Sequence, residues 1–382
     1  MSSLQKEVVK SRAKNLPNPA ILSSRLMQHK GHYKRDYEPV HWSQYFQDRK
    51  SIAIAEDVFY AYYQGNEGPL LVLIHGGGYS GLTWAQFTKA VTALVTCQIM
   101  AIDLRGHGSS KTKKDDDLSI NTLANDVVHI LEAISENRPI IMIGHSLGGA
   151  VAVRAAPLIP NVIGVIVIDV VEGTAMESLR SMQGFLRSRP AQFSSISKAV
   201  EWCVRSGQIR NVNSAKVSVP GQIKNIENNT LGADDLEHDP KPDPSDESNS
   251  ATSTLPAPLG TIVEGELSIS STTEESSSVK YTWRINLAQT EKYWNEWFHG
   301  LSSAFLELEA PKMLLLAGVD RLDKELTVGQ MQGKFQLQVL TACGHAIHED
   351  APDKVAEAVA TFLVRHKFAE PTADFTWTVP CC

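Results

Sequence analysis

The stretch Gly144-His145-Ser146-Leu147-Gly148 constrains the fold of this chain more than any other. It matches G-x-S-x-G and directly follows the apolar residues 140–143. In this pattern a strand ends, the chain turns sharply at the serine and a helix begins, so that the hydroxyl group stands exposed at the edge of a sheet. The two glycines leave room where a side chain would collide with the neighbouring strand or helix. The sequence therefore predicts a strand–turn–helix unit that presents Ser146 as a nucleophile.

Short apolar runs alternate with amphipathic stretches along most of the chain, which is typical of an α/β fold with a mostly parallel sheet. We expect strands at residues 51–55, 58–63, 70–74, 98–102, 140–143, 162–168, 312–317 and 336–340. We expect helices at 84–94, 120–132, 147–156 and 354–368. The first two strands should form an antiparallel hairpin at one edge, and a total of eight strands predicts the α/β-hydrolase fold.

The strand pattern stops after residue 171 and resumes at 312. In between, residues 176–187 and 196–204 have the pattern of short helices, and residues 281–306 carry aromatic side chains on a helical spacing. Helices inserted between two strands of such a sheet usually form a lid over the serine. Residues 225–278 are rich in Asp, Glu, Ser, Thr and Pro and poor in aromatic residues, which predicts disorder.

These patterns divide the chain into a core, an insertion and two ends. The α/β-hydrolase core is expected at 44–173 and 307–370, with the helical lid insertion, including the acidic Ser-rich loop, at 174–306. Residues 1–43 form an N-terminal extension, and residues 371–382 form a C-terminal tail.

Composition excludes several other classes of protein. The formal net charge of −7 argues against a nucleic-acid-binding protein, because such proteins usually carry a basic face. No apolar run approaches the roughly eighteen residues of a membrane span, and residues 1–14 lack the apolar middle of a secretory signal, so we expect an intracellular protein, cytoplasmic or nuclear. The five cysteines are odd in number and widely spread, which predicts free thiols and neither a disulfide framework nor a metal site.

A serine nucleophile needs a base that takes its proton. His345 follows the last predicted strand, which suits the base in the chain order Ser, Asp, His. Gly344 gives this loop the freedom to turn the imidazole ring inward, which favours His345 over the nearby His348. His145 lies inside the turn itself, where we expect it to pack behind Ser146.

The acid that orients the base has two candidate positions. Asp169 directly follows the predicted strand 162–168, where a charge after a nearly continuous apolar run needs a partner such as a histidine N–H. Asp320 and Asp323 follow the predicted strand 312–317, which is the commonest position for the acid in this fold. Sequence spacing alone does not decide between the two positions.

Two backbone N–H groups should bind the oxyanion that forms during acyl transfer. One is the N–H of Leu147, the residue after the nucleophile. The other should come from the loop His75-Gly76-Gly77-Gly78 after the third predicted strand. We choose Gly77, because a residue without Cβ lets the carbonyl oxygen of the substrate come close.

Several longer segments resemble the protein phosphatase methylesterases, and the likeness runs from about residue 14 to the C-terminus. The distinctive segments are IDVVEGTAM at 168–176, SGQIR at 206–210, YTWR at 281–284, LAGVDRLDK at 316–324, GQMQGKF at 329–335 and CGHA at 343–346. The resemblance implies that Ser146 is the nucleophile, His345 the base and Asp169 the orienting acid. The acidic Ser-rich segment is the part of the chain that matches the family least.

The resemblance implies removal of the methyl ester from the C-terminal leucine of the protein phosphatase 2A catalytic subunit. That subunit would be both substrate and binding partner, and the reaction would pass through an acyl-enzyme with no metal or organic cofactor. It further implies that docking of the phosphatase aligns the three catalytic side chains. A small-molecule esterase with a different lid lining and a non-catalytic phosphatase-binding protein are the two alternatives.

Overall fold

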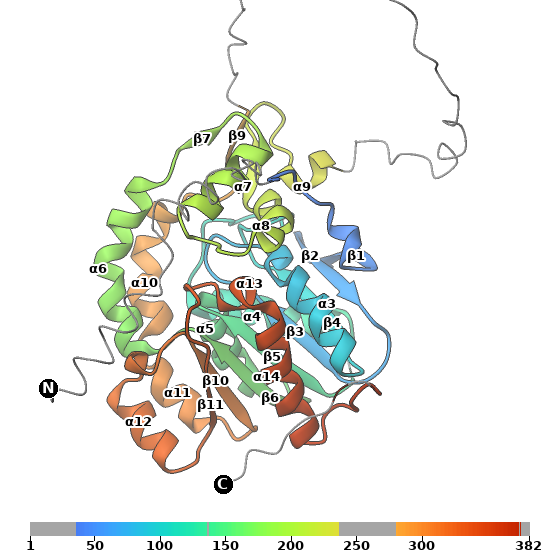
Figure 1. The fold of residues 1–382 in the computed structure, drawn as a ribbon, viewed down its shortest axis with the longest axis vertical. Helices are drawn as coiled ribbons and strands as arrows, with labels where there is room; N and C mark the ends of the chain where they lie inside the picture. The colour runs from blue at the N-terminus through green and yellow to red at the C-terminus, as the bar shows by residue number, and fades with distance from the viewer. Residues whose placement is uncertain (1–35, 136, 237–279, 374, 376–382) are drawn as a thin grey trace, which may run out of the picture. The chain divides into compact units, whose positions relative to one another are not determined.

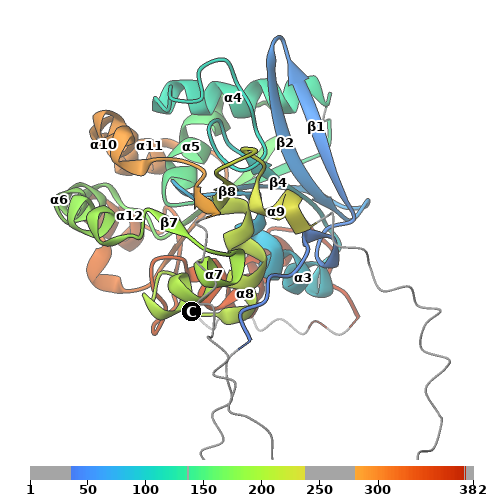
Figure 2. The same ribbon diagram turned by 90° about the horizontal axis from the view of Figure 1, so that it is seen from above.

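The computed structural model describes residues 36–135, 137–236, 280–373 and 375, and Figures 1 and 2 show its fold from two directions. Of residues 1–36, only Asp36 is described. Most of the predicted N-terminal extension and C-terminal tail therefore falls outside the described residues. Cys381 and Cys382 do so as well, whereas Cys97, Cys203 and Cys343 are free thiols, as predicted.

An eight-stranded, mostly parallel sheet forms the centre of the fold, as the apolar runs predicted. Its strands are β1 (Asp48–Ile54), β2 (Asp57–Gln64), β3 (Leu70–Ile74), β4 (Gln98–Asp103), β5 (Ile140–His145), β6 (Val162–Ile168), β10 (Lys312–Leu316) and β11 (Gln336–Val339). Their order is β1-β2-β4-β3-β5-β6-β10-β11. β1 and β2 form the predicted edge hairpin, β2 also pairs antiparallel with β4, and the remaining pairings are parallel.

Helices cover both faces of this sheet. They include α3 (Ala85–Leu94), α4 (Ile120–Ala133), α5 (Leu147–Ala155) and α14 (Pro352–Arg365). Alternate residues of a strand point to opposite faces, so in β3 Val72 packs in a cluster with α4 and α5, whereas Leu71 packs in a cluster with α3 and α14. Figure 2 shows α4 and α5 on one side of the sheet and α3 on the other. This burial on both faces explains why the central strands are continuous apolar runs in the sequence.

Between β6 and β10 the chain forms the predicted helical insertion (Figure 1). Its elements are α6 (Glu172–Ser188), β7 (Gln192–Phe193), α7 (Ile196–Arg205), α8 (Val212–Ser218), β8 (Ile223–Asn225), α9 (Gly232–Asp235), β9 (Tyr281–Trp283), α10 (Glu291–Phe298) and α11 (Leu301–Glu307). The strands β7, β9 and β8 make a small antiparallel sheet. An apolar cluster that includes Phe193, Val200, Cys203 and Ile223 gives the insertion a core of its own.

The prediction of disorder from residue 225 onward was wrong for its first part. Asn225 ends β8, and Leu231 and Ala233 are buried, with 4% and 2% of their surface exposed. Asp234 forms a 2.5 Å ion pair with Arg49 of β1. Two buried apolar side chains and this ion pair hold the polar stretch against the folded core, although the average composition of the stretch conceals the apolar residues. Residues 237–278 lie outside the described residues.

The helical pattern expected for 281–306 is correct only for its second part. Trp283 lies in β9 and packs its ring edge-on against Phe193, at 5.2 Å between ring centres, and against Trp202, at 5.8 Å. The aromatic residues of β9 fall by coincidence on the same helical spacing as those of α10. Large aromatic residues suit a strand as well as a helix, so the spacing did not distinguish the two.

Candidate active site

Ser146 lies in the turn between β5 and α5, with φ of 53° and ψ of −122°. Its backbone N–H donates to the carbonyl oxygen of Ile168 at 2.9 Å, which ties the turn to the neighbouring strand β6. A Cβ at Gly144 would lie 2.1 Å from the carbonyl oxygen of Gly148, and a Cβ at Gly148 would lie 2.2 Å from that of Ile74. Both glycines are therefore required, as the pattern predicted, and the surrounding sheet holds the strained serine in place.

Asp169 and His345 come together at the carboxyl end of the sheet. Asp169 follows β6 with a positive φ of 53°, and its N–H donates to the carbonyl oxygen of Leu315 in β10 at 2.8 Å. Its buried Oδ2 accepts a hydrogen bond from His345 Nδ1 at 2.8 Å, and its Oδ1 accepts one from the N–H of Ala317 at 3.0 Å. The carboxylate thus fixes the ring of His345 with Nδ1 protonated, and Nε2 is left available as a base.

Arg321, which the sequence analysis did not single out, also contacts this carboxylate. It lies in the short 3-10 helix η8 (Val319–Arg321) after β10, and its guanidinium forms an ion pair with Asp169 Oδ2. Burial alone would raise the pKa of Asp169, but the hydrogen bonds from His345 and Ala317 and the charge of Arg321 outweigh it and hold this pKa below its ordinary value. The carboxylate is therefore ionised at neutral pH.

The other two candidate acids have different places. Asp320 is exposed on η8. Asp323 caps the N-terminus of α12 (Lys324–Met331), where its Oδ1 accepts the N–H of Leu326 at 2.9 Å. Its Oδ2 accepts the hydroxyl of Ser302 at 2.5 Å. Neither carboxylate contacts His345, so only Asp169 has the position of an orienting acid.

The two other histidines near the serine are buried and hold neighbouring groups. Burial lowers the pKa of His348 to about 3, and its Nε2 forms a 2.9 Å hydrogen bond with Thr83 Oγ1. Burial also holds the pKa of His145 well below its ordinary value. His145 Nε2 donates to the carbonyl oxygen of His345 at 2.9 Å, so it supports the backbone of the loop that carries this residue.

Ser146, Asp169 and His345 line a single cavity of about 600 Å³. The side chain of His345 is 50% exposed. Within the described parts of the chain, its ring bonds Asp169 and forms no hydrogen bond with Ser146. The structure therefore joins the candidate acid and base and places the candidate nucleophile beside them in the same cavity.

The wall of this cavity comes mainly from the insertion and is mostly apolar. α6 and α10 lie side by side there, as Figure 1 shows. Their lining side chains include Leu179, Met182, Leu186, Trp294, Trp297 and Phe298. An apolar cavity with a few polar groups is the usual form of a site for an organic substrate.

Two buried histidines fix the loop 75–78 beside the serine. His75 Nδ1 donates to the carbonyl oxygen of Gly76 at 2.8 Å, and His75 Nε2 accepts the N–H of Leu104 at 3.0 Å. His107 Nε2 accepts the N–H of Gly78 at 2.9 Å, and burial lowers the pKa of His107 to about 4. Both rings must be neutral to accept these bonds, so the loop conformation does not depend on a charge.

Two backbone N–H groups beside the serine could donate hydrogen bonds to an oxyanion. Gly78 is occupied by His107, whereas in the described structure the N–H of Gly77 has no acceptor. The N–H of Leu147 begins α5 and therefore has no acceptor within the helix. Gly77 and Leu147, the two residues chosen from the sequence, both line the cavity with Ser146.

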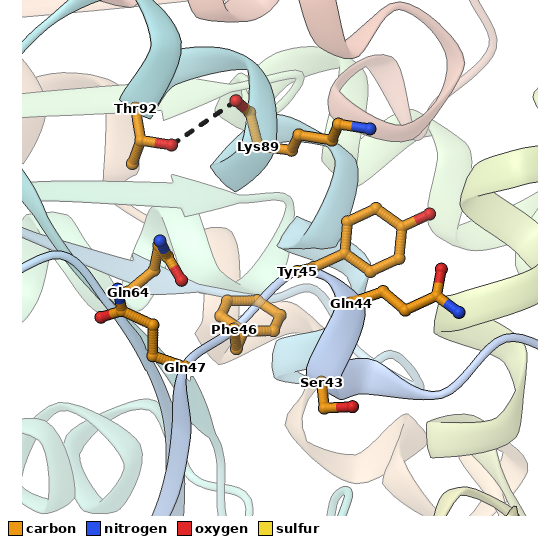
Figure 3. A pocket seen from close by; sticks show the side chains of 8 residues that line it. All are labelled: Ser43, Gln44, Tyr45, Phe46, Gln47, Gln64, Lys89 and Thr92. Carbon is orange, nitrogen blue, oxygen red and sulfur yellow. Dashed lines mark hydrogen bonds between the residues drawn. The ribbon is translucent and has the colours of Figure 1, made fainter. Parts of the chain in front are cut away.

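A second, smaller pocket of about 230 Å³ has none of these features. Figure 3 shows its lining side chains, among them Tyr45, Gln64 and Lys89, which come from the segment before β1, the end of β2 and α3. It shares no residue with the larger cavity.

Across the described residues there is no group of three His, Cys, Asp or Glu side chains that could hold a metal ion. In the same part of the chain, no helix combines the length and apolar character that a membrane crossing needs.

Comparisons with a family model and with solved structures agree on one fold. Residues 71–358 match the model of the alpha/beta hydrolase family. Among solved structures, E-2-(acetamidomethylene)succinate hydrolase superposes with a TM-score of 0.59 at 16% identity, covering 83% of this chain and 99% of that one. The thioesterase domain from the curacin biosynthetic pathway gives 0.55 at 16% identity, with coverage of 82% and 98%. At these identities the likeness concerns the fold alone.

Curated relatives share much more of the sequence. Protein phosphatase methylesterase 1 of Mus musculus is 50% identical over 361 residues, covering 91% of this chain and 90% of that protein. The Homo sapiens protein of the same name is 49% identical over 373 residues, with the same coverage. The probable protein phosphatase methylesterase 1 of Caenorhabditis elegans is 43% identical over 343 residues, covering 88% of this chain and 80% of its own length.

Proposed function

Because the chain belongs to the protein phosphatase methylesterases of the alpha/beta hydrolase family, we propose that it removes the methyl ester from the C-terminal leucine of the protein phosphatase 2A catalytic subunit. The observation that carries this proposal is the buried Asp169 carboxylate bonded to His345 beside Ser146, in one mostly apolar cavity. An acid, a base and a serine at a strained turn are the groups that acyl transfer requires.

The proposed reaction has two steps. Nε2 of His345 takes the proton of Ser146, and Oγ attacks the ester carbonyl carbon of the leucine. The N–H groups of Leu147 and Gly77 stabilise the oxyanion, methanol leaves with the proton from His345, and an acyl-enzyme remains. Water, activated by His345, then hydrolyses the acyl-enzyme and releases the free carboxylate.

The first step requires a hydrogen bond between Ser146 and His345. Catalytic hydrogen bonds are often long or misaligned in a free enzyme and tighten when substrate binds. We propose that docking of the phosphatase moves the two side chains into this bond. His345 can make this movement, because its side chain is half exposed and the one hydrogen bond of its ring among the described residues, to Asp169, leaves Nε2 free.

We propose that the core and the insertion have different roles in the reaction. The core at 44–173 and 307–370 supplies the catalytic groups, and the insertion at 174–306 forms the lid that receives the phosphatase tail. The support for this is that α6 and α10 of the insertion line the cavity with apolar side chains, which suit a leucine side chain.

The test is loss of methyl from the methylated protein phosphatase 2A catalytic subunit when this protein is added, with Ser146→Ala as the control. We expect release of methanol from the wild-type reaction only. Hydrolysis of simple aryl esters without demethylation of the phosphatase would identify a small-molecule esterase instead. Binding of the phosphatase with neither activity would identify a non-catalytic binding protein.

A further inference from the structure

Arg189 is a charged side chain of the cavity that the proposed reaction does not use. It directly follows α6 and lines the same cavity as Ser146. Its guanidinium carbon lies 3.6 Å from the ring centre of Trp283, a cation–π contact that orients the group. Its Nε atom is buried and, among the described residues, has no hydrogen-bond partner.

Among the residues that the structure describes, the guanidinium also has no anion to balance its charge. In the described structure no carboxylate pairs with Arg189, and the groups whose charge could act on it are the Cys203 thiol and the Tyr79 phenol. Burial raises the pKa of Cys203 to about 12 and holds the pKa of Tyr79 well above its ordinary value, so both are neutral at physiological pH. A partly buried cation without a counter-ion costs free energy, which an anionic ligand would recover.

Other polar groups line this cavity together with Arg189. Ser206, Gly207 and Gln208, which follow α7, are among them. Gly207 has φ of 77°, and no atom lies within 4 Å of the place where its Cβ would stand, so the space beside it is open. The buried Oε1 of Gln208 has no partner within the described residues. Arg189 thus faces a space that has room for a ligand and further groups to bind one.

The place of Arg189 at the C-terminal end of α6 points to the kind of ligand. The helix begins just after Asp169, and its apolar side chains Leu179, Met182 and Leu186 line the cavity between the catalytic end and Arg189. A peptide with its C-terminal ester at Ser146 would run along this wall. The terminal carboxyl group is esterified and carries no charge, so an anion for Arg189 has to come from a side chain upstream.

We propose that Arg189 binds the carboxylate of an aspartate or glutamate that precedes the esterified C-terminal residue of the peptide substrate. This inference rests on the proposed function and narrows it, because it makes the enzyme selective for acidic tails. Guanidinium and carboxylate form the strongest kind of protein hydrogen bond, and the low polarity of the cavity strengthens it further.

The test uses acetylated hexapeptides that end in leucine methyl ester. One Asp is placed in turn at each of the five upstream positions, and each peptide is compared with its Asn counterpart by kcat/KM for methanol release. For at least one position we expect the wild-type enzyme to prefer Asp about tenfold, and Arg189→Met to remove this preference. Arg187→Met is the matched control, because Arg187 is exposed in the last turn of α6, two residues from Arg189, and lies outside the cavity.

Retention of the Asp preference by Arg189→Met, its loss in Arg187→Met, or no preference in the wild-type enzyme would overturn the inference. Arg189→Lys should restore part of the preference, because it restores the charge without the planar fork. If Arg189→Met lowered kcat/KM equally for the Asp and Asn peptides, Arg189 would have only a structural role, and the inference would also be overturned.

A binding measurement separates this inference from the proposed function. Fluorescence polarisation with a labelled peptide and the inactive Ser146→Ala protein requires no turnover. Tighter binding of the Asp peptide than of the Asn peptide, lost on further substitution of Arg189 by Met, supports the carboxylate site even if the wild-type enzyme demethylates no phosphatase. Free acetate at the peptide concentration should not compete, and competition by acetate would show a site for small anions instead.

Discussion

At the Asp169 carboxylate, three donors from different parts of the chain meet. The His345 ring, the Ala317 N–H and the Arg321 guanidinium share its two oxygens. The sequence could place the candidate acids at the ends of two neighbouring strands, but both ends meet at the same edge of the sheet. Strand spacing therefore left the two positions open, and only the family resemblance favoured Asp169 before side-chain contacts were known. No sequence pattern indicated Arg321, because its contact with Asp169 depends on how the loop after β10 folds.

Asp169→Asn should lower turnover by roughly four powers of ten, as loss of the carboxylate does in comparable triads. The amide cannot hold the His345 ring in the required tautomer or stabilise the imidazolium ion. Asp320→Asn and Asp323→Asn are the matched controls, and methanol release from the methylated phosphatase is the measurement. A dead Asp320→Asn protein together with a nearly normal Asp169→Asn protein would reassign the acid.

Ser146→Ala should abolish turnover and leave binding of the phosphatase close to normal, because removal of one oxygen does not alter the surface around the cavity. A fluorophosphonate probe, which reacts with activated serines, should label the wild-type protein and not the variant. Labelling that persists in Ser146→Ala would point to another serine as the nucleophile.

Among the elements, the sequence predicted strands best and the insertion least well. The bounds of β3 and β6 agree with their apolar runs, because a strand buried on both faces consists of little else. α6 begins at Glu172, four residues before the expected start at 176, since its first turn carries no apolar periodicity. The strand β9 was missed because its three residues acquire their partners only when β7 and β8 fold beside them.

The stretch between β8 and α9 packs against the folded core, and a substitution of its buried leucine tests how much the stretch contributes to stability. Leu231→Asp should lower the free energy of unfolding by roughly 2–4 kcal/mol, because it places a carboxylate where a buried leucine was and leaves it unpaired. Thermal unfolding measures this change, and the exposed Asn228→Asp is the matched control. A melting temperature within one degree of the wild-type value would mean that the stretch does not contribute to the folded core.

For the whole molecule, one buried carboxyl group should lower stability as pH rises above the ordinary pKa of a glutamate. Both oxygens of Glu349, in α13 (Ile347–Asp350), are buried, and the hydroxyl groups of Ser218 and Thr83 offset only part of the cost of burying a charge there. Burial raises the pKa of Glu349 to about 8 from an ordinary value of 4.5. The folded protein therefore keeps the proton between these values while the unfolded chain loses it, so this group lowers stability as pH rises through that window.

Glu349→Gln should remove this penalty, since the amide has a similar shape and no charge to lose. We expect the free energy of unfolding at pH 7.5 to rise by roughly 2–4 kcal/mol, with little change at pH 4.5. Urea denaturation at several pH values measures it, with Glu357→Gln on the exposed face of α14 as the control. An equal gain at both pH values would show that packing is responsible and titration is not.

The position of the insertion between β6 and β10 means that the catalytic groups belong to two separable pieces of chain. A cut within residues 237–279 would leave Ser146 and Asp169 on one fragment and His345 on the other. The parallel pairing of β6 with β10, which runs from Val165 opposite Lys312 to Ile168 opposite Leu315, lies wholly inside the core and needs no covalent link across the cut. Residues 1–236 and 280–382, expressed as separate polypeptides, should therefore complement each other and regain esterase activity on mixing. A protease that nicks this segment would leave a two-chain enzyme.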